Sequence, residues 1–147
     1  MARAIKNLRL LLAGMTPRKA RGEYYIATVP HYAYEAALAA HALGVFREEE
    51  GMTLFLEKKA VGAISKIPRA QVSGPYSLIT LTVYSDLSAV GFIAAVSRAL
   101  AERGISVNAV SAFNHDHLLI PAGDAKRALK MLQRLSRDAK GTGAGRP

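Results

Sequence analysis

The sequence predicts an α+β fold in which two similar halves each pack helices against a small sheet. Three observations support this prediction. Short stretches of alternating apolar and polar residues, typical of strands with one buried face, occur in both halves of the chain. Between them, apolar residues recur at three- and four-residue steps, as in amphipathic helices. With 147 residues and 50% apolar composition, the chain can bury one core, or two small ones that share a sheet.

The first segment, residues 1–21, contains six lysine or arginine residues and no acidic residue. A basic N-terminal stretch with a leucine cluster has two interpretations: it is a transit peptide, or it is part of the fold. The lack of serine favours the second interpretation. So does the Thr16-Pro17 pair, which is typical of a turn that leads into a strand.

The first half begins with a strand at Glu23–Val29, where bulky residues alternate between the two sides and a proline ends the run. We expect an alanine-rich helix over His31–Leu43, which a glycine ends. The next expected elements are a strand at Val45 and Phe46, an acidic turn, a strand at Met52–Glu57 and a short helix at Lys58–Ile64. Residues 65–76 contain two prolines and a glycine without a clear period, which predicts a linker.

The second half has the clearest pattern. Leu78–Tyr84 alternates like a strand, and Ser88–Arg103 carries an apolar face at helical spacing, with capping residues before it and a glycine after it. We expect further strands at Ile105–Ser111 and Leu118–Ile120, joined by a polar turn and followed by a final helix. The strands joined through the first helix are expected to be parallel neighbours.

Both halves therefore follow the order of a ferredoxin-like β-α-β-β-α-β unit, with antiparallel or mixed sheets packed against helices. The second half lacks its last strand, which must come from elsewhere or from the N-terminal part of the chain. We divide the chain into an N-terminal half (8–64), a linker (65–76), a C-terminal half (77–137) and a flexible tail (138–147).

The segment SDLSAVGFIAAVSRALAERGISVNAV resembles the ACT domain, a small regulatory fold that binds amino acids and related metabolites. In that family an acidic residue and a Pro-Gly pair open a helix, and a glycine with Ile-x-Val starts the next strand. Asp86, Gly91, Gly104 and Ile105 occupy these places, whereas Val90 replaces the proline and two extra residues lengthen the turn. Together with GEYYIATV, REEEGMTLFLE and NAVSAFNHDHLLIP, the segment is similar to small stand-alone bacterial-type proteins with two ACT-like halves, over about residues 8–135.

The resemblance implies a ligand site at the strand-helix turn. There a glycine lets a ligand approach the backbone, and the free N–H groups of the helix start favour a carboxylate. Ser85 and Ser88 would add hydroxyl hydrogen bonds, and Asp86 would bind an α-ammonium group. In related domains, the start of the second strand of a neighbouring domain closes the pocket. The candidate binding residues are therefore Ser85, Asp86, Leu87, Ser88, Val90, Gly91, Phe92, Ile105, Ser106, Val107 and Asn108.

Purely structural roles remain open for the same residues. Ser85, Asp86 and Ser88 have the chemistry of helix caps, Gly91 allows close packing of helix on sheet, and Asn108 can satisfy backbone groups at a strand edge.

The segment Asn114–His117 is a second candidate site. His115 and His117 would project to the same side of a straight strand, and together with Asp116 they have metal-ligand chemistry. Two ligands two residues apart are a weak signal, so we expect a turn and a strand edge here, and no metal. The sequence contains no nucleophile, phosphate-loop or dinucleotide motif, and no catalytic residue is predicted.

The net charge of +9 comes from the two ends of the chain. Residues 1–21 and 126–147 hold six and seven basic residues against none and one acidic residue, whereas residues 22–125 hold seven against ten. No basic stretch has interleaved aromatics, so we interpret the ends as solvated surface and predict no specific nucleic-acid partner. Contact with phosphates or with an acidic partner is the alternative.

The lack of cysteine excludes disulfides and a cysteine nucleophile. No apolar run approaches the ~20 residues needed to cross a bilayer, so we expect a cytoplasmic protein without a membrane partner.

These features predict a non-enzymatic regulatory protein that binds a small molecule, expected to be an amino acid, and needs no cofactor. We expect a homodimer, because an incomplete sheet leaves an edge to be covered, and we expect the ligand to favour one arrangement of its parts. The alternatives are a protein-interaction module with a vestigial pocket, a metal-dependent enzyme built on His115, Asp116 and His117, and a nucleic-acid binder.

Overall fold

The computed structural model describes residues 4–35 and 41–141. The chain divides into two compact units. Unit 1 combines Met1–Ala20 with Ser77–Pro147, and unit 2 is formed by Arg21–Tyr76. Residues 8–20, which the sequence analysis assigned to the N-terminal half, therefore lie in the unit formed by the C-terminal half.

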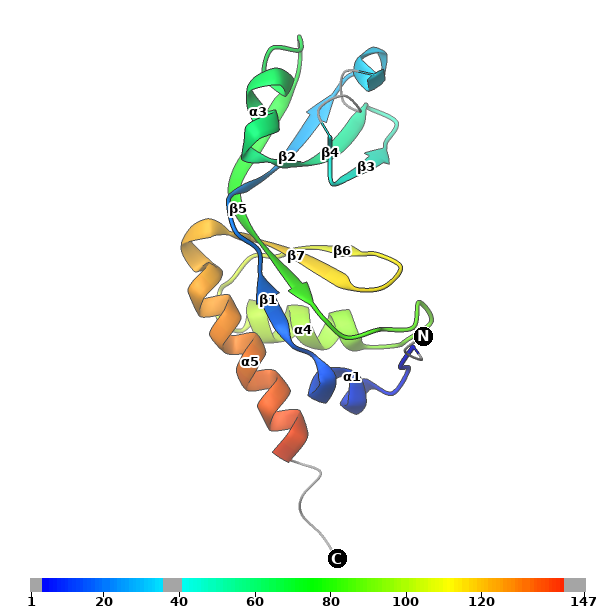
Figure 1. The fold of residues 1–147 in the computed structure, drawn as a ribbon, viewed down its shortest axis with the longest axis vertical. Helices are drawn as coiled ribbons and strands as arrows, with labels where there is room; N and C mark the ends of the chain where they lie inside the picture. The colour runs from blue at the N-terminus through cyan, green and yellow to red at the C-terminus, as the bar shows by residue number, and fades with distance from the viewer. Residues whose placement is uncertain (1–3, 36–40, 142–147) are drawn as a thin grey trace, which may run out of the picture. The chain divides into compact units, whose positions relative to one another are not determined.

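Unit 2 is a small antiparallel sheet with a helix packed on it (Figure 1). The strand order in this unit is β3-β4-β2-β5, and only the first part of β5 takes part. The elements are β2 (Tyr24–Val29), β3 (Gly44–Arg47), β4 (Met52–Glu57), α3 (Lys58–Ile64) and β5 (Gln71–Leu81).

The core of unit 2 follows the alternation that the sequence predicts for β4. Met52, Leu54 and Leu56 are buried, and Ala60 and Ile64 of α3 belong to the same apolar cluster. The expected helix over residues 31–43 is only partly covered by the structure. Its start is a 3-10 turn (η1, His31–Ala33), and residues 36–40 lie outside the described residues.

Unit 1 has the strand order β1-β5-β7-β6, and its helices α1, α4 and α5 lie on one face of this sheet (Figure 1). The strands besides β5 are β1 (Pro17–Lys19), β6 (Asn108–Ser111) and β7 (Asp116–Pro121). The helices are α1 (Leu8–Gly14), α4 (Phe92–Ala101) and α5 (Ala125–Gly141), the last preceded by a 3-10 turn, η2 (Ala122–Asp124). Leu11 and Met15 enter the same core as Val96, Ile120 and Leu132.

The missing last strand of the second half comes from the N-terminal part of the chain. β1 pairs antiparallel with the end of β5, so that Pro17 lies opposite Leu81. With this strand, unit 1 has the strand order of a ferredoxin-like fold, and unit 2 has the same order without help from residues 1–20. The predicted fold class is confirmed.

One expectation about strand neighbours is wrong. β5 and β6 are joined through α4 but do not lie side by side, because β7 lies between them. The turn after β6 folds β7 back along β6, in register from Asn108 opposite Leu119 to Ser111 opposite Asp116. The second strand of this hairpin takes the place next to β5.

Several predicted boundaries differ from the structure. Residues 71–76 of the expected linker form the first part of β5, because they pair with β2. Residues 138–141 of the expected tail belong to α5, and residues 142–147 lie outside the described residues. β6 begins at Asn108, three residues later than the strand predicted from Ile105. None of the helices in the described parts of the chain combines the length and the apolar character needed to span a membrane.

Candidate functional site

The turn between β5 and α4 is held by the N-terminal segment. The backbone N–H of Ile5 donates to the carbonyl of Tyr84 at 2.8 Å, and the N–H of Asp86 donates to the carbonyl of Ile5 at 2.9 Å. Lys6, the next residue, brings its ammonium group to 3.9 Å from the Asp86 carboxylate. The candidate turn is therefore built from two distant parts of the chain.

Asp86 is occupied by the turn itself. Its Oδ1 accepts the backbone N–H of Ser88 at 2.9 Å and the Ser88 hydroxyl at 2.5 Å, and its carbonyl accepts the N–H of Ala89. The hydrogen bonds from Ser88 hold the pKa of the Asp86 carboxyl below its ordinary value. This local turn also explains why α4 begins at Phe92, four residues after the predicted start.

Gly91 makes the entry into α4 possible. It adopts φ +90°, in the left-handed region that disfavours side chains, and it is the N-cap residue of the helix. No side chain caps this end of α4. The first N–H groups of the helix have no partner inside it, as at any helix start, and they can bind a negatively charged group.

A cavity of about 160 Å³ lies beside this turn and the first residues of α4. β6, the residue after it and the start of β7 close it on the other side. The lining residues are Ser85, Asp86, Leu87, Ala89, Gly91, Phe92, Ile93, Ala94, Ser111, Ala112 and Asp116.

Asp116 is the most notable polar residue of this cavity. Only 4% of its surface is exposed. The Ser111 hydroxyl donates to its Oδ1 at 2.6 Å, and the Ser85 hydroxyl donates to its Oδ2 at 3.0 Å. Burial of a carboxylate costs free energy unless hydrogen-bond donors replace the lost water. The two serine hydroxyls replace part of it.

The structure brings together only some of the predicted site residues. Ser85, Asp86, Leu87, Gly91 and Phe92 line the cavity. Those that do not line it are Ser88, Val90, Ile105, Ser106, Val107 and Asn108.

Four of these six residues have a clearly different environment. Val90 is 83% exposed, and Ser88 is bound to Asp86. Ile105 is buried beside a different cavity, described below, and it precedes β6 at the other end of α4. Asn108 is an exposed residue at the first position of β6.

Sequence reasoning missed Asp116 and Ser111 as members of this site. Asp116 was interpreted together with its two histidine neighbours, although the period of two in a strand places it on the opposite side from them. A carboxylate at an inward position of an apolar strand was the available signal, since such a group needs buried partners.

His115 and His117 make separate contacts. Nδ1 of His115 lies 3.2 Å from the carbonyl of Val83, and Nδ1 of His117 lies 3.0 Å from the Thr80 hydroxyl. The His115 ring also contacts Tyr84, with ring centroids 4.9 Å apart. Across the parts of the chain that the structure covers, no three side chains of the metal-binding types come together.

Comparison with known proteins places both halves of the sequence in one family. Two family profiles, each described as ACT domain, match residues 3–64 and 73–134. A search of the curated proteins found no match.

Solved structures resemble most of the chain, across both halves. A Vibrio cholerae protein of unknown function, described as a possible transport protein, is 38% identical, with a TM-score of 0.75 over 88% of this chain and 95% of that one. An Agrobacterium tumefaciens protein is 22% identical, with a TM-score of 0.65 over 83% and 89% of the two chains. The regulatory subunit of aspartate kinase from Thermus flavus shares the fold at 14% identity, with a TM-score of 0.61 over 82% and 97%.

Proposed function

Because this chain belongs to the ACT domain family, with one ACT domain in each half of the sequence, we propose that it is a regulatory protein that binds a free amino acid and catalyses no reaction itself. The proposed site is the cavity at the start of α4. The observation that carries the proposal is the buried carboxylate of Asp116, which lines this cavity together with the first turn of the helix.

The groups around the cavity complement both charges of an amino acid. The N–H groups at the start of α4 suit its carboxylate. Each Asp116 oxygen accepts one serine hydroxyl, and a carboxylate has about four acceptor positions, so an ammonium group can still bind there. Leu87, Ala89 and Phe92 offer apolar surface to the ligand side chain.

The size of the cavity narrows the choice of amino acid. Its volume of about 160 Å³ is below the roughly 300 Å³ at which pockets for drug-sized ligands begin. We therefore expect amino acids with small side chains to bind more tightly than aromatic ones.

A thermal-shift screen with the twenty amino acids, followed by calorimetric titration of any hit, tests the proposal. Ligand at a hundred times its dissociation constant adds about 2.7 kcal/mol to the free energy of unfolding. Asp116→Asn keeps the shape but removes the charge, and it should weaken binding at least tenfold, as expected for a lost charged hydrogen bond. Glu102→Gln removes an exposed carboxylate at the end of α4 and should leave binding unchanged.

Ala112→Leu provides a second variant in case Asp116→Asn folds poorly. Ala112 is exposed and lines the cavity, so a larger side chain should fill it without disturbing the core. A flat screen with folded protein would contradict the proposal. So would a hit that binds equally well to wild type, Asp116→Asn and Ala112→Leu.

We extend the proposal to association between copies of the chain. A bound ligand would shift the equilibrium between two arrangements of these copies, because it has a different affinity for each. The edge expected from an incomplete second half is not available, because β1 covers it. β3 is the end strand of the other unit, and its Val45 and Phe46 are 37% and 65% exposed. Size-exclusion chromatography with light scattering gives the molar mass of the protein with and without amino acid, which tests this step.

The same exposed side chains favour a second candidate, a module that binds another protein. Tyr32 is 70% exposed, so a second aromatic side chain of unit 2 besides Phe46 lies on the surface. A flat amino-acid screen on a protein that captures a partner through these residues would favour this function over the first.

A further inference from the structure

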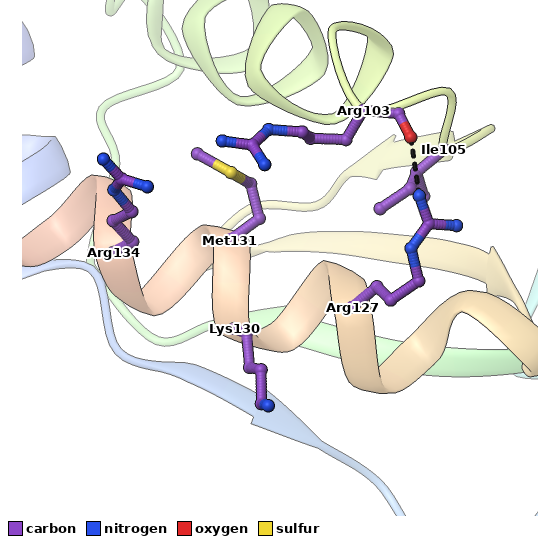
Figure 2. A pocket seen from close by; sticks show the side chains of 6 residues that line it. All are labelled: Arg103, Ile105, Arg127, Lys130, Met131 and Arg134. Carbon is purple, nitrogen blue, oxygen red and sulfur yellow. Dashed lines mark hydrogen bonds between the residues drawn. The ribbon is translucent and has the colours of Figure 1, made fainter.

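A second cavity in unit 1 lies between the end of α4 and α5, and its volume is about 270 Å³. It shares no lining residue with the cavity at the start of α4. Figure 2 shows the six residues that line it: Arg103, Ile105, Arg127, Lys130, Met131 and Arg134.

The charge of this lining is entirely positive. Four of the six residues are cationic, and no acidic residue lines the cavity. Two cations have carboxylate partners outside the lining: Arg127 lies 2.6 Å from Asp124, and Arg134 lies 3.6 Å from Asp138. Among the residues that the structure describes, no carboxylate pairs with Arg103 or Lys130, so the cavity keeps an excess of positive charge.

Arg127 fixes one wall of the cavity. Besides its contact with Asp124, its guanidinium donates to the backbone carbonyl of Arg103 at 2.8 Å, which ties α5 to the turn after α4 (Figure 2). The N–H groups of Gly104 and Ile105 donate to carbonyls in the last turn of α4. The last carbonyls of α4 thus already have backbone donors and do not require the side chains of Arg103, Lys130 or Arg134.

The cavity also has apolar surface. Ile105 is 3% exposed, and Met131 is half-buried. Figure 2 shows the Arg103 side chain extending over Met131, whereas Lys130 points away from both. A ligand in this place would contact guanidinium groups and an apolar surface at the same time.

We propose that this cavity binds the phosphate group of a small phosphorylated molecule, with Arg103 and Arg134 as the main phosphate ligands. The planar guanidinium group donates paired hydrogen bonds to phosphate as well as to carboxylate oxygens. A phosphate group, with about −1.5 to −2 charge and three acceptor oxygens, suits two guanidinium groups better than a single carboxylate does. Ile105 and Met131 would contact the uncharged part of the ligand. The volume is slightly below the roughly 300 Å³ of typical small-molecule pockets, so the ligand is of about mononucleotide size.

A small molecule fits these observations better than a nucleic-acid chain. Binding of single strands uses aromatic side chains on which bases stack, and the lining contains none. Three of the cationic residues, Arg103, Arg127 and Arg134, line one cavity and do not follow an extended groove. The basic C-terminal segment, which the sequence analysis left as solvated surface, would then supply Arg134, one of the two main ligands of a specific anion.

Calorimetric titration of the full chain with ADP, pyrophosphate and adenosine tests the proposal. ADP and pyrophosphate should bind, and adenosine, which has no phosphate, should not. Arg103→Gln and Arg134→Gln should each weaken ADP binding about tenfold or more, because each removes a charged hydrogen bond. Arg137→Gln removes the same charge from an exposed position of α5 outside the cavity and should change binding less than twofold.

Three results would overturn the proposal. The first is no heat of binding with either ADP or pyrophosphate at millimolar concentration. The second is equal weakening by Arg137→Gln and Arg103→Gln, which would indicate diffuse attraction to a basic surface. The third is tighter binding of a 20-base-pair duplex than of ADP, with a steep salt dependence, which would assign the surface to nucleic acid. Thermal melts of the variants, with Arg127 left intact, show whether each one is folded.

Discussion

Two aspartates near the start of α4 differ in what already occupies their oxygens. One oxygen of Asp86 is taken by Ser88, within the same turn. Among the described residues, the Asp116 carboxylate accepts two serine hydroxyls: Ser111 of β6, five residues away, and Ser85 of the turn after β5, which is distant in sequence. Residue type and spacing made Asp86 the expected partner of an ammonium group. Only the pairing of β6 with β7 brings Asp116, the more deeply buried of the two carboxylates, to the same cavity.

His117 is expected to make the stability of the protein depend on pH. Burial and the nearby His115 lower its pKa, so the native state binds fewer protons at this site than the unfolded state. Stability should therefore fall as the pH drops below about 6.5, the ordinary value for histidine, toward the lowered pKa. Urea unfolding at pH 7.5 and 5.5 measures this loss.

Replacement of His117 identifies the source of that loss. His117→Gln should make the free energy of unfolding less sensitive to pH between these two values. His31→Gln removes an exposed histidine in unit 2 and should leave the pH dependence of the free energy of unfolding as it is in the wild type. The same pH dependence in His117→Gln and wild type would contradict the assignment. The neighbouring Asp116, which acts in the opposite direction on the His117 pKa, stays in place in both variants.

Alanine substitutions at two glycines should change the stability of the protein in opposite directions. Gly91→Ala puts a side chain at φ +90° and should cost about 1–2 kcal/mol. Gly62 lies inside α3 with open space around a new Cβ, so Gly62→Ala should add about 0.5–1 kcal/mol to the free energy of unfolding. Thermal unfolding of both variants gives the comparison. A neutral Gly91→Ala would mean that the turn can relax, and that Gly91 is not needed for its backbone conformation.

At the scale of elements, α1 shows how the N-terminal segment stabilises unit 1. Leu11 is fully buried in the core with α4 and α5, whereas Leu10 on the same helix is 49% exposed. Leu11→Ala should cost about 2–5 kcal/mol, the range for a leucine removed from a packed core. Leu10→Ala should cost less than about 0.5 kcal/mol. Denaturant unfolding of both variants measures the two losses in the free energy of unfolding. Equal losses would contradict the packing of α1 through Leu11.

Elements with a strong local pattern were predicted with accurate bounds. β4 and α3 occupy Met52–Glu57 and Lys58–Ile64, as expected, because the switch from alternation to helical spacing falls at one point of the chain. α1 was not predicted, since a short run of leucines beside basic residues does not show which face is buried. The order of β5, β6 and β7 also escaped prediction, because it depends on which strand of a hairpin takes the place beside β5.

The predicted binding residues remain a prediction, and those of them that line one cavity are contiguous in sequence. Ser85–Phe92 contributes most of the cavity lining, and the resemblance to the ACT domain identified it. Ile105–Asn108 were expected to close the pocket from a neighbouring domain, and this stays a prediction. Within unit 1 the opposite wall consists of Ser111, Ala112 and Asp116, near the turn between β6 and β7. Spacing along the chain cannot reveal which end of a strand faces a distant turn.

At the scale of the whole molecule, the units are not the two halves of the sequence. The family profiles match 3–64 and 73–134, whereas unit 1 takes its helix α1 and its strand β1 from the first of these segments. β5 contributes its first residues to unit 2 and its last residues to unit 1. Separating the two halves of the sequence should therefore destabilise the two units to different extents.

A fragment of residues 77–147 should fail to fold cooperatively, although it contains all but the first four residues of the family match at 73–134. It lacks β1, which pairs with β5, and it lacks Leu11 and Met15 from the core. Adding residues 4–20 behind it through a glycine-serine linker should restore a cooperative thermal transition, because termini tolerate such rearrangement when the contacts are kept. The same rearranged chain with Leu11→Asp and Met15→Asp should lose the transition, since both charges would be buried without partners. If residues 77–147 alone melted as sharply as the rearranged chain, unit 1 would fold without the N-terminal segment, and the proposed ligand site at the start of α4 would not depend on Ile5 and Lys6 to hold its turn.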